Sequence, residues 1–249
     1  MQAEQVIYLL WFTGLGLLGT LTATLVAKRM WRKFPFFMTW VLVDLLQGIV
    51  DYSLYQLHDP VAYMYTHWTF ELLTMFLGLG VVYEIFQHLF AAYGSLKRLA
   101  TTLFQAAVVV LVLAGCVVMY THSPVAGNRF VAGFVVVEQG IRIVELGLLV
   151  CLFILSSAFG LHWRQSIFGI GLGLTIFVAA QLAGITLRAY SGPGAVRIMD
   201  LSRVLSFNLS LLVWLGYLLV PERVTSTTGA LQKGQLEQWN QAVRELIYQ

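Results

Sequence analysis

Charged residues are scarce in this chain. Lysine and arginine number 15 and aspartate and glutamate 12, so only 11% of the 249 residues are charged. A soluble globular domain carries about 25% charged residues, while disordered and nucleic-acid-binding chains are more polar or more basic. With 59% hydrophobic residues and a mean hydropathy of +0.78, the composition excludes these classes and any nucleic-acid partner. It predicts a polytopic membrane protein with the lipid bilayer as its main partner.

Proline and cysteine are sparse as well. The five prolines fall between apolar runs or at their edges, so the chain lacks the Pro-broken helices and the obvious internal repeat that many carriers show. Cys116 and Cys151 lie inside apolar runs and in no CxxC or Cys/His spacing. This placement predicts packed thiols and gives no zinc site.

The motifs of several intramembrane chemistries are missing too. The last apolar run, 198–220, has no lysine that could hold retinal, and the chain has no HxxxH, GxSG or GxGD sequence. No enzymatic activity is therefore indicated. One cofactor hypothesis stays open, because paired histidines on two helices can bind haem. The candidates are His67 and His122 near one membrane face and His88 and His162 near the other.

Seven apolar segments are long enough to cross a bilayer, whose hydrocarbon core of about 30 Å needs about 20 helical residues. They run over roughly 5–27, 35–57, 62–91, 99–121, 130–159, 167–189 and 198–220. Barrel strands are shorter and alternate in polarity, so these runs are predicted to be helices. The expected fold is an all-α integral membrane protein: a seven-transmembrane-helix bundle over 1–222, followed by a tail over 223–249.

Basic residues indicate the orientation of the bundle. Ten of the fifteen lie in the connections 28–33 and 97–98, at Arg164 or in the tail, and only three lie in the opposite connections. Because lysine and arginine accumulate in cytoplasmic loops, the N-terminus is predicted outside and the C-terminus inside. We expect a multi-pass protein of the plasma or inner membrane.

The tail contains one more helical pattern. Between 231 and 249, five apolar residues recur on one stripe: Leu236, Trp239, Val243, Leu246 and Ile247. Such a stripe predicts a short amphipathic helix. It can lie on the inner membrane surface, or it can dock a cytoplasmic partner or a second copy of the chain, which would make a homo-oligomer; the pattern leaves both open.

Many of the acidic residues fall inside the predicted spans, where each costs about 2.5–3.5 kcal/mol and marks a functional site by default. They follow helical spacing and form four polar stripes, which must turn toward the bundle interior. The stripes supply the candidate ligand-binding residues: Asp44, Asp51 and Tyr55; His67 and Glu71; Glu138, Arg142 and Glu145; and Arg203. At 1.5 Å rise per residue, most of them lie in the outer half of the membrane.

This predicted cluster is rich in negative charge. Counting Asp200 at the start of the last span, six acids meet two arginines and His67. Either an internal network of ion pairs fixes the helices in register, or a cation or cationic ligand supplies the missing charge. Whether a metal binds there stays unknown. A second His/Glu pair, Glu84 and His88, lies near the inner end, where we expect Glu84 to meet a basic residue.

Three functions fit these observations. The leading hypothesis is a sensor- or receptor-like protein with an outward-facing polar pocket that binds a ligand or cation. The alternative is a proton- or ion-coupled transporter, since buried carboxylates suit proton relays. The third is an accessory membrane subunit whose charged interior is structural.

Overall fold

The computed structural model describes residues 2–89, 129–158, 165–190 and 196–220, together with six separate helical positions between 102 and 113. Within these residues the chain is helical, with no strand. The long helices are α1 (Gln2–Ala27), α2 (Pro35–Gln56), α3 (Pro60–Leu89), α5 (Arg129–Ala158), α6 (Gln165–Tyr190) and α7 (Val196–Leu219). A short 3-10 turn, η1 (Met30–Arg32), joins α1 to α2.

Six of the predicted spans are confirmed as helices, with ends within three residues of the predicted ones. All six are long and apolar enough to cross a membrane, which indicates a multi-pass membrane protein. The span predicted over 99–121 and the amphipathic tail helix lie outside the described residues, apart from the separate positions. The count of seven and the orientation of the termini therefore stay predictions.

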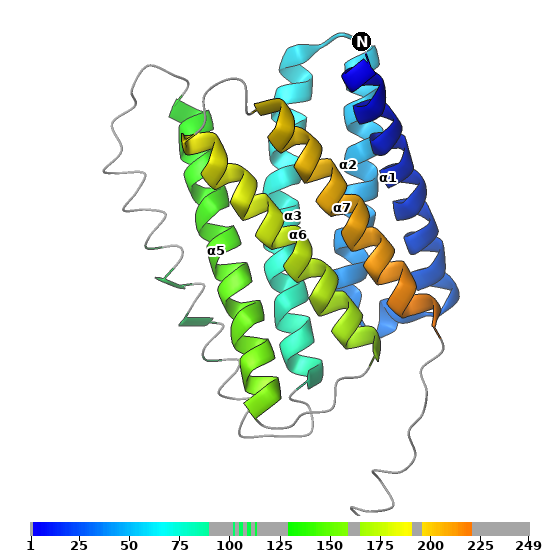
Figure 1. Ribbon diagram of the computed structural model, residues 1–249, viewed down its shortest axis with the longest axis vertical. Coiled ribbons are helices and arrows are strands. Elements are labelled where there is room, and N and C mark those ends of the chain that lie inside the picture. Colours follow the sequence, from blue (N-terminus) through cyan, green and yellow to red (C-terminus); the bar gives the residue numbers. More distant parts are fainter. Residues whose placement is uncertain are drawn as a thin grey trace, which may run out of the picture.

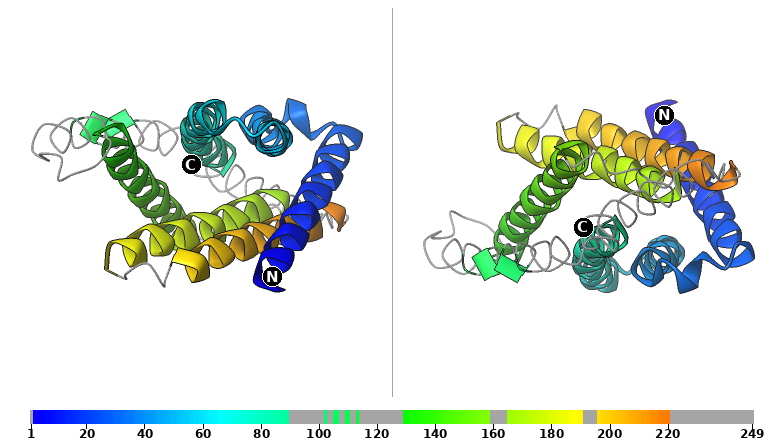
Figure 2. Two further views of the ribbon diagram at one scale, coloured as in Figure 1. Left: turned by 90° about the horizontal axis from the view of Figure 1, so that it is seen from above. Right: turned by 90° about the horizontal axis from the view of Figure 1, so that it is seen from below.

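The six helices form a ring. Going round it, α1 packs against α2, α2 against α3, α3 against α5, α5 against α6, α6 against α7, and α7 against α1. Figure 1 shows them side by side along the long axis of the molecule, and the end-on views of Figure 2 show the ring. Besides its two neighbours, α3 also contacts α6 across the ring. Polar residues on inward faces of different helices can therefore meet in the interior.

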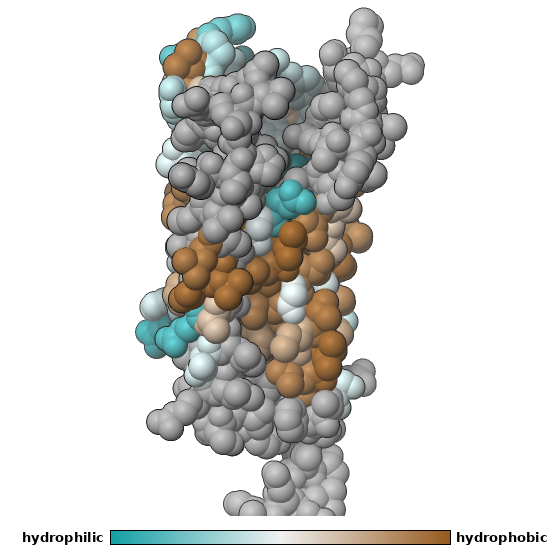
Figure 3. All heavy atoms as spheres, turned by 90° about the vertical axis from the view of Figure 1, so that its left-hand side faces the viewer, coloured by the Kyte–Doolittle hydropathy of each residue, from teal (hydrophilic) through white to brown (hydrophobic). Residues whose placement is uncertain are grey.

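Burial departs from the pattern of a soluble protein at both extremes, around an apolar core. Charged side chains of Glu71, Arg142 and Glu145 are buried, while Leu9 and Ile154 are more than 60% exposed. Charged residues are almost never fully buried in soluble proteins unless paired. In Figure 3, the described residues form a hydrophobic band across the middle of the face, with hydrophilic residues above and below it. This arrangement suits a surface that contacts lipid.

Local capping explains how α3 begins. Pro60 stands at its first position, where proline's missing N–H costs nothing. The Asp59 carboxylate accepts hydrogen bonds from the backbone N–H groups of Val61 and Ala62 at 3.2 and 3.0 Å. These bonds satisfy two donors that have no partner within the helix. These contacts fix the start of α3. The end of the bundle where α2 connects to α3 is called the α2–α3 end below.

At the opposite end, Glu84 of α3 caps α2. Its two carboxylate oxygens accept hydrogen bonds from the backbone N–H groups of Phe36 and Phe37, at 3.2 and 3.1 Å. Among the described residues Glu84 does not meet the lysine or arginine that was expected; the positive end of the α2 dipole and its unpaired N–H groups fill that role. His88 stacks on Phe34, with ring centroids 4.6 Å apart.

The α6–α7 contact depends on two glycines. A Cβ on Gly173 would overlap the indole of Trp214, and a Cβ on Gly169 would overlap the ring of Tyr217. The Trp214 indole N–H then donates to the backbone carbonyl of Ile170 at 3.1 Å. Small residues allow helices to approach closely in membranes, and here they admit two aromatic rings.

Candidate functional site

A chain of buried ion pairs links three helices. One oxygen of Glu71 on α3, Oε1, is 2.7 Å from a guanidinium nitrogen of Arg203 on α7. The same oxygen is 3.5 Å from a guanidinium nitrogen of Arg142 on α5. Arg142 in turn donates to Oε2 of Glu145, one helical turn further along α5, at 3.1 Å. The predicted convergence of stripes from these three helices is therefore observed.

The solvent exposure of the side chains falls steadily along this series of ion-paired residues. The Arg203 side chain is 37% exposed, Glu71 9%, Arg142 2% and Glu145 0%. Arg142 also lies over the ring of Phe177, 5.3 Å from its centroid. The aromatic face adds cation–π attraction where water is excluded. The ion-pair network thus runs from a partly accessible arginine to a fully enclosed carboxylate.

A second pair lies nearer the α2–α3 end. Nδ1 of His67 on α3 is 2.9 Å from Oδ2 of Asp51 on α2. The amide nitrogen of Gln47 is 3.4 Å from the same ring nitrogen, and the Gln47 side chain also interacts with the Glu71 carboxylate. Gln47 therefore lies between the Asp51–His67 pair and the ion pairs of Glu71, and the two sets of residues form one network.

Two further acids belong to this network through their charge. Asp44 on α2 interacts electrostatically with Glu71, Arg142 and Arg203 but makes no hydrogen bond or ion pair with the described residues. Glu138 on α5 is buried and interacts electrostatically with Arg203. All four stripes thus contribute to one charged cluster, which we define as Asp44, Gln47, Asp51, His67, Glu71, Glu138, Arg142, Glu145 and Arg203.

The charged cluster carries an excess of negative charge. Five carboxylates against two guanidiniums leave a formal charge of −3 when His67 is neutral. Two unit charges 4 Å apart interact by about 4 kcal/mol at an effective dielectric constant of about 20. Repulsion of this size cannot be ignored in a buried site. The cluster can lower it by binding protons or a cation.

Three buried atoms of the cluster have no hydrogen-bond partner among the described residues: Oδ1 of Asp51, Oε1 of Glu145 and Nε of Arg142. Oε1 of Glu145 lies against the backbone of α3, where a Cβ on Gly78 would overlap it. Buried polar atoms in folded proteins are nearly always paired. The carboxylate oxygens of Asp51 and Glu145 therefore each lack a donor that a proton or a bound cation would replace.

Some residues of the predicted stripes lie elsewhere. Tyr55, a predicted ligand-binding residue, is 58% exposed, and its hydroxyl accepts a hydrogen bond from Tyr8 of α1 at 2.9 Å. Ser206 and Ser210 share the helical face of Arg203, at three and seven residues after it, and their hydroxyls donate to carbonyls of their own helix. The side chain of Asp200 lies outside the described residues. Gln47 was missed because it is neutral, although it stands three residues after Asp44 and four before Asp51, on the same side of α2.

A metal site of three or more histidine, cysteine or carboxylate ligands is not found in the described part of the chain. Of the four histidines of the haem hypothesis, His122 and His162 lie outside the described residues. His67 and His88 each use Nδ1 in a contact, with Asp51 and with the Glu84 carbonyl respectively. The haem hypothesis is thus untested.

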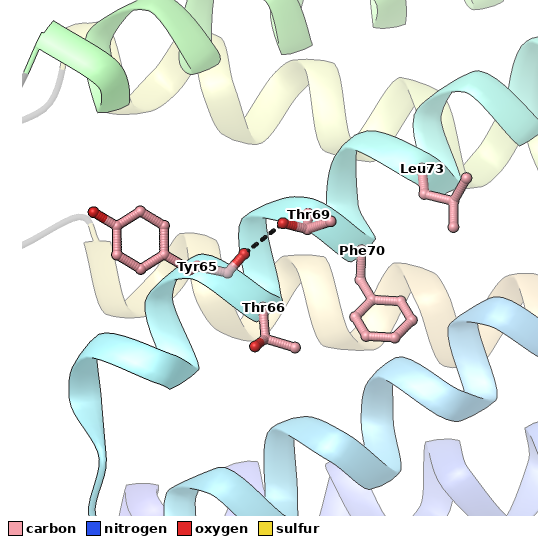
Figure 4. A pocket seen from close by; sticks show the side chains of 5 residues that line it. All are labelled: Tyr65, Thr66, Thr69, Phe70 and Leu73. Carbon is pink, nitrogen blue, oxygen red and sulfur yellow. Dashed lines mark hydrogen bonds between the residues drawn. The ribbon is translucent and has the colours of Figure 1, made fainter.

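A groove of about 350 Å³ lies on α3, lined by Tyr65, Thr66, Thr69, Phe70 and Leu73 (Figure 4). At about 100° per residue these side chains occupy the side of α3 opposite to Glu71. The Thr69 hydroxyl donates to the Tyr65 carbonyl at 2.7 Å, so it has no need of a ligand. The groove is separate from the charged cluster, and it lies on a face that suits contact with lipid.

No protein-family model, no curated protein and no solved structure matches this chain. The fold and the site thus define a class only: a polytopic helical membrane protein with a charged cluster in its interior.

Proposed function

We propose that this protein is a receptor-like membrane protein whose charged cluster binds a cation or a cationic ligand. Among the ion-paired members of the cluster, Arg203 and His67 have the most exposed side chains, at 37% and 28%, and both lie about 10 Å from the ends of their helices at the α2–α3 end. The basic residues predict that end to be outside. A ligand would reach the site from there, and helix movement or the tail would transmit the signal to the cytoplasm.

The observation that carries the proposal is that four acids of the cluster besides Glu138, namely Asp44, Asp51, Glu71 and Glu145, outnumber its two arginines, together with the unpartnered carboxylate oxygens of Asp51 and Glu145. An internal network that served only to hold the helices would be expected to balance its charges, because each uncompensated buried carboxylate costs stability. A bound cation removes the imbalance. It would also shift the helices that supply the acids, because the ligand interacts differently with each arrangement of them.

The test uses cation-dependent thermal stability of the purified protein in lipid nanodiscs. Sodium, potassium, magnesium, benzylammonium and benzyltrimethylammonium chlorides are each compared with bulky N-methylglucammonium chloride at equal ionic strength. A cation that binds the folded state at 100 times its Kd adds about 2.7 kcal/mol of stability. We expect at least one of these salts to produce a clear rise in Tm.

The informative variant is the double substitution Asp44→Asn with Asp51→Asn. Neither acid forms an ion pair with an arginine, so the change lowers the cluster charge from −3 to −1 and leaves the Glu71 pairs in place. We expect a folded protein without the cation response. Glu84→Gln is the matched control, because Glu84 is a buried acid of α3 outside the cluster. A cation response that persists in the double variant, or none in the native protein, would contradict the proposal.

A second candidate is a proton- or ion-coupled transporter. Its support is the gradient of exposure, from 37% at Arg203 to 0% at Glu145, which is the arrangement a stepwise transfer of charge into the membrane requires. Proton and cation flux in proteoliposomes tests it. Flux at the level of empty liposomes would exclude the transporter and leave the receptor as the remaining proposal. Flux that Glu145→Gln abolishes would favour the transporter.

A further inference from the structure

The Asp51–His67 pair offers two hydrogen-bond acceptors that nothing in the described chain uses. The carboxylate of Asp51 can only accept when ionised, so the proton between the pair is assigned to Nδ1 of His67. Nε2 of the neutral imidazole is then an acceptor. No described residue hydrogen-bonds Nε2, and none hydrogen-bonds the buried Oδ1 of Asp51. Because Nε2 points away from the carboxylate that holds Nδ1, it is the acceptor of the pair that a donor from outside can reach.

The imidazole is held in place and is reachable. Tyr63 stacks on it almost in parallel, with centroids 5.7 Å apart and planes 7° apart. Trp68 meets it edge-on at 5.9 Å. The His67 side chain is nevertheless 28% exposed, against 14% for Asp51. The pair thus combines a fixed acceptor, an anionic neighbour and an aromatic wall that can cover an apolar body.

The other charged groups near the pair leave its negative charge uncompensated. Asp44 interacts electrostatically with Asp51 and adds to the negative potential. Both arginines of the cluster are engaged elsewhere: Arg203 is 2.7 Å from Glu71, and Arg142 donates to Glu145. A positively charged occupant is therefore favoured over a neutral or anionic one.

We propose that the Asp51–His67 pair recognises a protonated amine through its N–H groups. This inference rests on the proposed function and names the class of ligand. An ammonium N–H donates to Nε2 of His67, the negative charges of Asp51 and Asp44 attract the ammonium group, and the apolar part of the amine lies against Tyr63 and Trp68. A quaternary ammonium carries the same charge without an N–H donor, and a metal ion finds no third protein ligand among the described residues.

Two probes of nearly equal shape distinguish these cations. Benzylammonium has three N–H donors, and benzyltrimethylammonium has none. Affinity is measured with the full chain in lipid nanodiscs, by calorimetry and by quenching of tryptophan fluorescence. We expect benzylammonium to bind at least tenfold more tightly than its trimethyl analogue.

The variant that tests the acceptor is His67→Phe, which keeps an aromatic ring against Tyr63 and removes Nε2. We expect it to abolish the tenfold preference. His88→Phe is the matched control, since His88 lies on the same helix, also stacks on an aromatic ring, and is far from the cluster in sequence. The control should keep the preference unchanged. Circular dichroism and Tm verify that both variants are folded, and if His67→Phe is not, His67→Gln replaces it.

The outcomes separate this inference from the function on which it rests. Equal or tighter binding of the trimethyl analogue, or a preference that survives loss of His67, overturns the amine class and leaves a cation site in place. If neither amine binds while sodium, potassium or magnesium stabilises the protein through Asp44 and Asp51, the amine class is overturned but the proposed cation-binding function stands. If no cation binds at all, both proposals fail.

Discussion

Removing a positive charge from the interior of the bundle should cost far more stability than removing a negative one. Arg142 and Glu145 allow a direct comparison, because they form one ion pair on one helix and are 2% and 0% exposed. In a charge-balanced pair the two losses would be similar. In a cluster of formal charge −3, replacing Arg142 by glutamine raises the excess to −4, whereas replacing Glu145 by glutamine lowers it to −2.

The magnitudes follow from the contacts. Arg142→Gln leaves Glu145 without a cationic partner among the described residues and removes one of the two cations beside Glu71. Loss of one partner of a buried ion pair costs about 3–5 kcal/mol. In Glu145→Gln, Arg142 keeps Glu71, and the glutamine oxygen still accepts a hydrogen bond, so we expect a cost of about 1 kcal/mol. A difference of at least 2 kcal/mol is about a 30-fold difference in the unfolding equilibrium.

Reversible unfolding in mixed lipid–detergent micelles measures this difference. The double variant Arg142→Gln with Glu145→Gln should recover part of the loss, because it removes the carboxylate that the first change leaves unpaired. If Arg142→Gln does not fold, Arg142→Lys keeps the charge and should fold with an intermediate loss. Equal destabilisation by Arg142→Gln and Glu145→Gln would refute the charge excess and with it the main argument for a bound cation.

Three further predictions concern packing and capping. Gly78→Ala should destabilise the protein by about 1–3 kcal/mol, because the added methyl group overlaps the Glu145 carboxylate. A Cβ on Gly147 meets no described atom within 4 Å, so Gly147→Ala should be neutral or should stabilise the protein by up to about 1 kcal/mol through the higher helix propensity of alanine; the same unfolding assay compares the two variants. Glu84→Ala should cost about 0.5–2 kcal/mol through the lost cap of α2, with hydrogen exchange increased at Phe36 and Phe37. Asp59→Ala should cost a similar amount and increase exchange at the first turn of α3 only.

The membrane imposes two strong constraints that made the spans and the charged stripes predictable. Backbone groups in lipid must be paired within the segment, so long apolar runs are helices, and their ends agree with the structure. Charged side chains must avoid lipid, so Glu71 and Arg142 were expected to face the interior and do so. Both constraints act on single helices and need no knowledge of their neighbours.

What depends on neighbouring helices could not be predicted. Tyr55 shares the helical stripe of Asp44 and Asp51, yet it pairs with Tyr8 because α1 packs beside that part of α2. Glu84 was expected to need a basic partner, but the start of α2 supplies two N–H groups instead. Gln47 gave no signal because an amide costs much less in a membrane than a carboxylate. In each case the partner comes from another helix, and helical periodicity does not identify it.

The shared oxygen of Glu71 has a mechanical consequence. Arg142 on α5 and Arg203 on α7 share this one atom, and α6 lies between their helices in the ring. A change that moved Arg203 away would leave Arg142 as the one arginine that contacts this oxygen among the described residues. The positions of α5 and α7 are therefore coupled through a single oxygen, although the contacts between their helices run through α6.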